Sequence, residues 1–467
     1  MPVRHVAISA SHEIYSSMTA AVKAMVEVRI ANLDQRERQA RQSGRRRRLV
    51  ETTPMLRSID GGVDDQKFLY PVPDNLPLIV FPLLSYALAG VEVSVYGSPE
   101  IGRVVDVVRA RLVRDGRIRD SEAIRFVEED RGQISMSRSL RKAASRLTAP
   151  PGAMILWSAG DLVLAYNTYR RLADPHARDH EIVIDLNARQ VVFPAGSPEL
   201  FPRNYLDGMR LEGAEHRVVD VKEPNALLFT AAGLSGLDRL DELRHPPPGD
   251  THLDALVRLA VTAVRGASLR ATAALVWYGL KRRWGALGDR DGILQRHAVD
   301  LASAAFGVPT MVKADNVDPF FMRDCDGFED LFGYYRTLLQ SIVDSASTRE
   351  AGYRELARYY PYADVLYRLS YDFRPLQDEI PLWRHWPDIV RDKIAAFNQR
   401  FEAELDRRGP HGPPQLIPEY FDDARGAFRG IPAPSDDLRA TRELLLGGYG
   451  AAFERDRERY CRLAADR

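Results

Sequence analysis

An uninterrupted apolar run, Ala153 to Trp157, constrains the fold of this chain more than any other segment. Ser158-Ala159-Gly160-Asp161 follows it directly. A short continuous apolar run that ends in a loop is typical of a parallel strand buried on both faces. In an open sheet of such strands, ligands collect at the carboxyl ends. The run therefore predicts a strand that presents Gly160 and Asp161 at the ligand-binding edge of a sheet.

Strand and helix patterns alternate along roughly the first 340 residues. Further strands are expected at His5–Ala10, Val91–Tyr96, Ala226–Thr230 and Thr310–Lys313. Helices are expected at Pro82–Ala89, Glu100–Arg114, Ser135–Arg146, Leu253–Val264, Ala267–Trp284 and Asp291–Ala305. This alternation favours an α/β fold, Rossmann-like, with three layers and a mainly parallel sheet.

The pattern changes near residue 342, where helical spacing takes over and Pro-rich breaks occur at His411–Pro414 and Ile431–Pro434. We predict an α/β domain over residues 1–341, with an insertion at about 12–66, and a helical C-terminal appendage over residues 342–467. The aromatic residues of the appendage, which include Tyr360 and Tyr362, are interpreted as helix packing within it.

The bulk composition favours a small-molecule substrate. The 467 residues include 65 Lys and Arg and 65 Asp and Glu, so the formal net charge is zero. A nucleic-acid or membrane-surface binder normally carries a basic excess, so we expect neither partner. The two cysteines, Cys325 and Cys461, lie far apart, which fits a reducing compartment. No signal peptide or long apolar span is evident, and we expect a cytoplasmic bacterial protein.

Asp161 is the first candidate for chemistry. A carboxylate at a strand end, after a glycine that allows close approach, can hold a hard cation. Mg²⁺ prefers one or two carboxylates together with substrate phosphates. The alternative is a turn aspartate that caps the next helix, since Leu162 to Leu172 has helical spacing.

A second acidic segment, Asp324 to Leu331, has two readings as well. Asp326 and Glu329 have the spacing of a capping box in front of an apolar helix. A capping role leaves a neighbouring carboxylate available for a metal ion, so Asp326 and Asp324 both stay candidates.

Several segments, taken in order, resemble the GT-A-like nucleotidyltransferases, which include the MobA-like and sugar-1-phosphate nucleotidyltransferases. Lys67-Phe68-Leu69-Tyr70-Pro71-Val72 resembles the family's K-x-L-x-P-V run, and Phe81 to Leu88 its following helix. Met154 to Asp161 resembles the strand that ends in the metal-binding G-D. The segments Lys222 to Ala226 and Val308 to Leu331 are similar to the family's K-x-x-N and its closing acidic stretch. The resemblance covers about residues 3–340.

The resemblance implies transfer of a nucleotidyl group from a nucleoside triphosphate (NTP) to a phosphorylated small molecule. Asp161 and Asp326, or Asp324 in its place, would hold Mg²⁺. Lys67 would bind the triphosphate and Lys222 the acceptor phosphate. Five further positions would contact substrate, namely Ser9, Ala10, Gly160, Arg203 and Asn225.

One departure from the family pattern keeps other functions open. The family's first loop is rich in glycine, whose backbone N–H groups cradle the triphosphate. Here the first strand runs into Ser9-Ala10-Ser11-His12-Glu13, with no glycine. Gly61-Gly62 or Arg45–Arg48 could replace that loop, or the site could have lost its activity. The alternative functions are a non-catalytic binding or assembly protein and a GT-A glycosyltransferase. The C-terminal helices are candidates for a homodimer contact.

Overall fold

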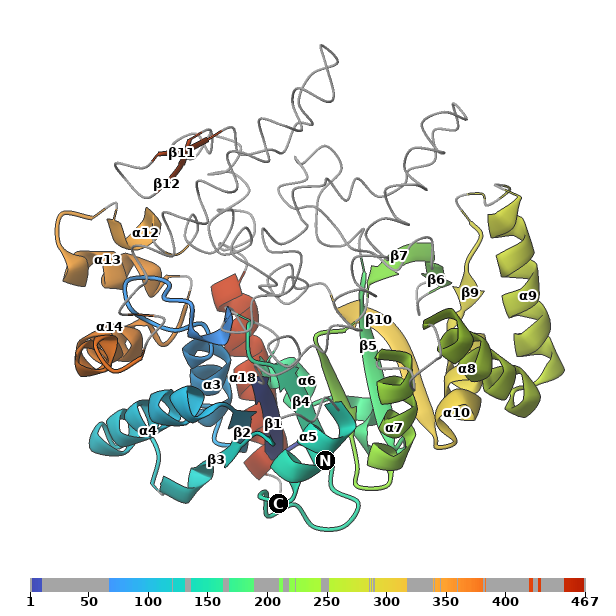
Figure 1. Cartoon of the computed structure of the whole chain (residues 1–467), viewed down its shortest axis with the longest axis horizontal. Helices are drawn as coiled ribbons and strands as arrows, with labels where there is room; N and C mark the ends of the chain where they lie inside the picture. The colour runs from blue at the N-terminus through green and yellow to red at the C-terminus, as the bar shows by residue number, and fades with distance from the viewer. Residues whose placement is uncertain are drawn as a thin grey trace.

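The chain folds around a central β-sheet that carries helices on both faces, as the computed structural model shows (Figure 1). The residues that the structure describes are 2–10, 67–119, 121–130, 136–162, 168–188, 210–212, 218–222, 224–244, 252–284, 286, 288, 290–316, 339, 341–344, 346–358, 360–380, 383, 420–422, 427–429 and 449–465.

Seven strands form the central sheet in the described part of the chain, in the order β3-β2-β1-β4-β8-β5-β10. Their bounds are β1 His5–Ala10, β2 Glu92–Gly97, β3 Ile124–Glu128, β4 Ile155–Ala159, β5 Ile182–Ala188, β8 Ala226–Phe229 and β10 Thr310–Asn316. β8 runs antiparallel to both of its neighbours, β4 and β5, and the other six strands run parallel. The predicted mainly parallel sheet is therefore confirmed.

Short strands extend the sheet beyond β5. They are β7 (Val218–Lys222), β6 (Arg210–Glu212) and β9 (Ile293–Leu294). A separate antiparallel pair joins β11 (Tyr420–Asp422) to β12 (Ala427–Arg429).

Side-chain alternation along the strands explains the three layers. Val6 and Ile8 of β1 point into one hydrophobic cluster, and Ala7 points into another on the opposite face. Because successive side chains of a strand point to opposite faces, a strand that is apolar throughout needs cover on both sides. The confirmed Rossmann-like fold follows from this requirement.

Helices from distant parts of the chain cover the first face. They are α3 (Val80–Ala87), α4 (Pro99–Arg114), α6 (Thr168–Leu172), α13 (Arg349–Leu356), α14 (Ala363–Asp372) and α18 (Tyr449–Ala465), with α12 (Ser341–Asp344) beside α13. α4 begins where the sequence favours it, because the Ser98 hydroxyl accepts a hydrogen bond from the Ile101 N–H (3.4 Å) and Pro99 takes the first helical position.

The opposite face is covered by α5 (Met136–Ala144), α7 (Gly233–Arg244) and α10 (Gln295–Phe306). α8 (His252–Gly266) and α9 (Leu269–Arg283) pack against α10 and lie at one end of the molecule, with α13 and α14 at the other (Figure 1). Single turns of 3-10 helix occur at η2 (Lys67–Leu69), η3 (Ser121–Ala123), η4 (Pro175–Arg178) and η7 (Arg374–Gln377).

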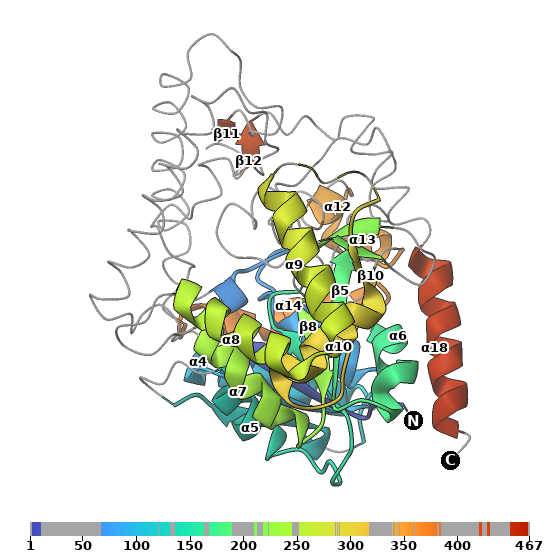
Figure 2. The same ribbon diagram turned by 90° about the vertical axis from the view of Figure 1, so that its right-hand side faces the viewer.

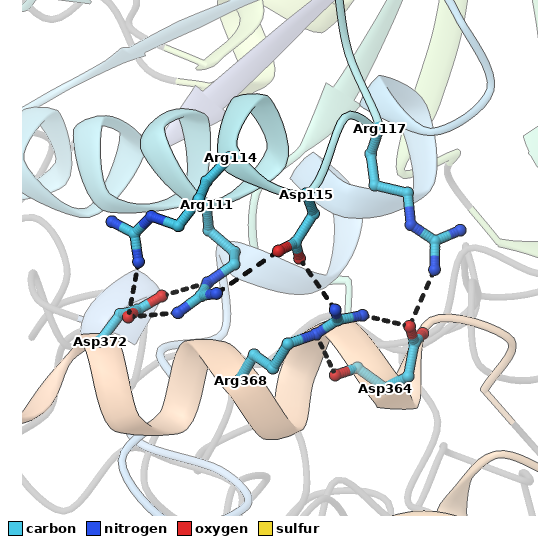
Figure 3. Close-up of polar contacts among 7 residues, drawn as sticks. All are labelled: Arg111, Arg114, Asp115, Arg117, Asp364, Arg368 and Asp372. Atoms are coloured by element: carbon cyan, nitrogen blue, oxygen red, sulfur yellow. Dashed lines mark hydrogen bonds and ion pairs between the residues drawn. The ribbon is translucent and has the colours of Figure 1, made fainter.

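An ion-pair network joins helix α14, from the region after residue 342, to α4 of the α/β core (Figure 3). Arg111 holds Asp372 through two hydrogen bonds of 2.5 and 2.6 Å, and Arg368 bridges Asp115 (3.4 Å) and Asp364 (2.5 Å). The Arg111–Asp372 pair is bidentate and largely shielded from water, which is the geometry in which such pairs stabilise most. The predicted helical C-terminal region is therefore tied to the sheet domain by charge as well as by packing.

In the described residues, no helix combines the length and the apolar character that crossing a membrane requires. The insertion expected at about 12–66 lies outside the described residues. The division at residue 341 and the homodimer contact stay predictions.

Candidate functional site

The carboxyl ends of β1 and β4 meet at the centre of the sheet. The two strands run parallel with Ser9 opposite Ala159, and the Gly160 N–H donates to the Ser9 carbonyl (2.9 Å). A Cβ atom added at Gly160 would lie 2.9 Å from that carbonyl oxygen and 2.7 Å from the Ile79 side chain. Only glycine fits between these neighbours. The predicted site residues Ser9, Ala10, Gly160 and Asp161 therefore lie together at this edge.

An ion pair forms the centre of the site. The Lys67 Nζ lies 2.6 Å from the Asp161 Oδ2, and the two side chains are 13 % and 2 % exposed. These residues are 94 positions apart in the sequence. Charged side chains this deeply buried are rare and are usually paired or functional. The structure thus brings together the two residues expected to bind a triphosphate and a metal ion.

Lys67 is held in place by the turn that carries it. The carbonyl groups of η2 are engaged by the backbone, since Tyr70 N–H donates to Lys67 O (3.1 Å) and Ile79 N–H to Phe68 O (3.1 Å). The Trp383 indole N–H donates to Leu69 O (2.7 Å) in the buried interior. A C-terminal residue therefore helps to fix the backbone next to Lys67.

Tyr360 gives a second C-terminal contact near the site. Its hydroxyl donates to the Phe81 carbonyl of α3 (3.0 Å), and burial raises the pKa of Tyr360, so that it stays a donor. The sequence indicated packing within the appendage for this residue. The structure shows that Tyr360 packs against Tyr362 and also reaches α3, because α14 and its neighbours pack on the same face of the sheet. No pattern in the sequence indicates which helix these aromatic side chains would meet.

Asn225 completes the group of predicted residues at this edge. Its carbonyl accepts a hydrogen bond from the Ala159 N–H (3.1 Å), and its side chain is buried. Because β8 runs antiparallel to β4, its amino end lies beside the carboxyl end of β4. A strand reversal thereby places Asn225 beside Gly160 and Asp161.

The remaining predicted residues are not part of this described group. Lys222 ends β7, where its backbone pairs with Asn187 at the end of β5. Arg203, Asp324 and Asp326 lie outside the described residues. For Asp161, the helix-capping alternative does not apply to α6, which begins seven positions later at Thr168.

A second buried ionic group was not anticipated. Lys313 of β10 lies 2.9 Å from Asp174 and 3.3 Å from Asp185, which faces it in register on β5. Lys313 is 7 % exposed and Asp174 5 %. The sequence indicated only a core strand here, since nothing in the pattern connects Asp174 to a strand that begins more than a hundred residues later. This group fastens the turn after α6 to β5 and β10.

The site offers one carboxylate as a ligand for a hard cation such as Mg²⁺. The Asp161 carboxylate supplies oxygen ligands of the kind Mg²⁺ takes, and it already holds the Lys67 ammonium. Among the residues that the structure describes, no three His, Cys, Asp or Glu side chains gather as a metal-binding group. One protein carboxylate together with substrate phosphates is compatible with Mg²⁺, and a dedicated protein cage is not present in that part of the chain.

Comparisons with known proteins find similarity to solved structures only, and that similarity is weak. No protein-family model matches the chain, and no curated protein matches its sequence. A solved structure of a hypothetical transferase from Thermus thermophilus is similar at 16 % identity and a TM-score of 0.38, over 70 % of this chain and 100 % of that one. A protein from Bacillus anthracis, named as a glucose-1-phosphate thymidylyltransferase and solved with sucrose, is similar at 10 % identity and a TM-score of 0.27, over 52 % and 76 %.

HddC from Yersinia pseudotuberculosis is similar at 12 % identity and a TM-score of 0.25, over 40 % of this chain and 77 % of that one. At these identities and TM-scores, none of the three proteins says what this chain catalyses. The function is therefore inferred from the arrangement of the residues at the sheet edge.

Proposed function

We propose that the chain is a Mg²⁺-dependent nucleotidyltransferase, which transfers NMP from an NTP to a phosphorylated sugar, cyclitol or other alcohol and releases pyrophosphate. The observation that carries the proposal is the buried Lys67–Asp161 pair at the carboxyl ends of β1 and β4. An ammonium group and a carboxylate at one strand edge are the two charges that a metal-bound triphosphate needs.

In the proposed reaction, a phosphate oxygen of the acceptor attacks the α-phosphorus of the NTP. The bond from that phosphorus to the bridging oxygen breaks, and the electron pair leaves with pyrophosphate. Catalysis of this kind depends on alignment of the two phosphates and on stabilisation of negative charge. The protein itself therefore has mainly to hold charges in fixed positions.

Each residue of the site has a separate task in this proposal. Lys67 would neutralise the triphosphate, and Asp161 would hold Mg²⁺ together with Asp326 or Asp324. Bound Mg²⁺ would supply charge neutralisation at the phosphates. The predicted substrate contacts Ser9, Ala10 and Gly160 lie at the same strand edge, and they would contact the nucleotide there.

The site for the phosphorylated acceptor is assigned from the sequence. Lys222, with Arg203, would bind the acceptor phosphate, and Asn225 would contact the substrate from the start of β8. The backbone of Asn225 is fixed by Ala159, so its position relative to Asp161 is set by β-sheet hydrogen bonds. A rigid strand end is a suitable support for a substrate contact.

Pyrophosphate release tests the proposal. Each NTP in turn, with Mg²⁺ and a panel of sugar, cyclitol and alcohol phosphates, should reveal one productive pair. Asp161→Asn and Lys67→Met should each lower kcat/KM for that pair on the order of a hundredfold, since each removes a charge that acts on the transferring phosphate. Arg103→Met is the control, because it breaks only the exposed Arg103–Glu379 pair on the surface and should leave the rate unchanged.

The outcomes separate the candidate functions. Wild-type rates in Asp161→Asn would refute the assigned role of this carboxylate. NTP binding without turnover on any acceptor would favour the non-catalytic binding protein. Turnover of a ready-made nucleotide sugar, with release of a nucleoside diphosphate, would instead identify a glycosyltransferase.

A further inference from the structure

Helix α9 is apolar on two sides. One side carries Ala271, Leu275 and Tyr278, which pack toward α10 and β9. The other side carries large apolar residues that are exposed, and with the following Trp284 we call them the α9 face: Leu269, Val276, Trp277, Leu280 and Trp284. A surface helix of a globular protein normally has one apolar stripe, which faces the core. The second stripe of α9 therefore needs an explanation other than folding.

The α9 face is continuous along the helix. Leu269, Val276, Leu280 and Trp284 are separated by seven, four and four positions, which places them on one side of a helix, and Trp277 lies next to them. Trp277 is 57 % exposed, Trp284 66 % and Leu269 88 %. Single exposed apolar residues are ordinary, but a continuous stripe with two tryptophans marks an interaction surface.

Positive charge is concentrated on the same helices. The segments of α8 and α9 contain six Lys and Arg and one Asp, a local net charge of +5 in a chain whose total is zero. Arg258, Arg265 and Arg270 are exposed. Lys281 lies 5.6 Å from the centre of the Trp277 ring and 2.7 Å from Asp291. Asp300 accepts a hydrogen bond from the Ser268 N–H in the turn between the two helices.

This combination of charge and shape selects among possible partners. An antiparallel pairing of two α9 helices would bring Arg270 of one copy close to residues 281–283 of the other, all of them basic. A second copy is thus disfavoured by charge repulsion. α9 also lies on the outer side of the molecule (Figure 2), so its apolar stripe projects outward.

We propose that the α9 face docks the protein on an anionic membrane surface, with α9 lying in the plane of the interface. Helices that bind in this way carry Trp and Leu on one face and Lys and Arg beside it. Tryptophan favours the headgroup level, where its ring is buried and its N–H stays solvated. Basic residues beside it add attraction to acidic lipids.

The charge balance of the whole chain predicted no membrane partner, because a sum over 467 residues hides an excess confined to two helices. The α9 face is also separate from the Lys67–Asp161 site. α9 packs on α10 and β9, whereas the site lies at the ends of β1 and β4. Docking and catalysis can therefore be tested independently.

Vesicle co-sedimentation of the full chain tests this proposal. One set of vesicles consists of phosphatidylcholine alone and the other also contains phosphatidylserine. We expect binding to the second set only, with weaker binding as ionic strength rises from about 0.1 M to about 0.5 M. The affinity of W277S/W284S for these vesicles should be at least about tenfold lower than that of wild type. Arg270→Glu should also lower the affinity.

Val113→Ser is the matched control. Val113 is an exposed apolar residue (42 %) on α4, away from α8 and α9, and its replacement should leave vesicle binding unchanged. Circular dichroism and thermal unfolding of each variant establish that the fold is retained.

Three results would overturn the proposal. The first is no vesicle binding by the wild-type chain, which would leave an acidic protein partner as the better occupant. The second is equal binding by wild type and W277S/W284S. The third is a wild-type dimer in sedimentation velocity that becomes monomeric in W277S/W284S, since the face would then join two copies.

Discussion

The Lys67–Asp161 pair allows a prediction about stability that needs no substrate. Two unit charges 2.6 Å apart attract each other by about 6 kcal/mol at an effective dielectric constant of about 20. Desolvation offsets much of this energy, because the Asp161 side chain is 2 % exposed and that of Lys67 13 %. Removal of one partner leaves the other charge in a largely dry site, which costs about 3–5 kcal/mol. We expect Asp161→Asn to lower the free energy of unfolding by about 3 kcal/mol, since the amide oxygen can still accept a hydrogen bond.

A double-mutant cycle in urea measures the interaction directly. It compares wild type, Asp161→Asn, Lys67→Met and the double variant, and we expect the double variant to be about 2 kcal/mol more stable than the two single losses predict. The same cycle on the exposed Arg103–Glu379 pair should give a coupling below about 1 kcal/mol. A Lys67–Asp161 coupling as small as that of the surface pair would show that the two charges do not depend on each other, and the reasoning about the site would fail.

Three further predictions concern the stability of the fold. Gly160→Ala should lower the free energy of unfolding by about 1–3 kcal/mol, because its Cβ would lie 2.9 Å from the Ser9 carbonyl oxygen. Gly279→Ala, in open space on α9, should instead raise it by about 0.5–1 kcal/mol, and two losses of equal size would contradict the packing argument. Tyr360→Phe should cost about 1 kcal/mol in urea unfolding, since it removes a buried hydrogen bond to the Phe81 carbonyl of α3; an unchanged midpoint would argue against this bond. Burial lowers the pKa of His5 below its usual value near 6.5, so the folded protein keeps His5 neutral where the unfolded chain binds a proton. The free energy of unfolding should therefore fall as the pH drops below about 6.5, and it should fall less in His5→Gln. If the free energies of unfolding of wild type and His5→Gln fell in parallel with pH, His5 would not contribute to this pH dependence.

Most strands of the central sheet were predicted, because each depends on the apolar pattern of its own short segment. β1 has the bounds expected for a short buried strand, and α4 starts one residue before the expected position because Pro99 takes the first helical position. The apolar run before Gly160 indicated a central buried strand, and β4 does lie between β1 and β8. Parallel strands place their carboxyl ends at one edge, so a sequence that fixes the strands also indicates where Asp161 and Ser9 meet.

The sequence could not indicate contacts between distant segments. The 93 residues between Lys67 and Asp161 contain no periodic signal that would bring these two charges within 2.6 Å. The reversal of β8, which places Asn225 beside the site, depends on hydrogen bonds to β4 and β5 and not on the residues of β8 alone. The sequence also predicted a helix at Ala267–Trp284 but not its exposed stripe, because a sequence does not say which apolar side meets the core.

By itself, then, the sequence determined the α/β class, the positions of the core strands and the presence of Gly160-Asp161 at a strand end. These features depend on hydrophobic periodicity and turn residues within short windows, where the backbone alone sets the geometry. Only the tertiary structure decided that Lys67 pairs with Asp161, that Trp383 supports the turn that carries Lys67 while Tyr360 contacts α3, and that α9 keeps a second apolar side in water. Each of these depends on packing between segments far apart in the chain, and that packing is selected by the burial of the whole core.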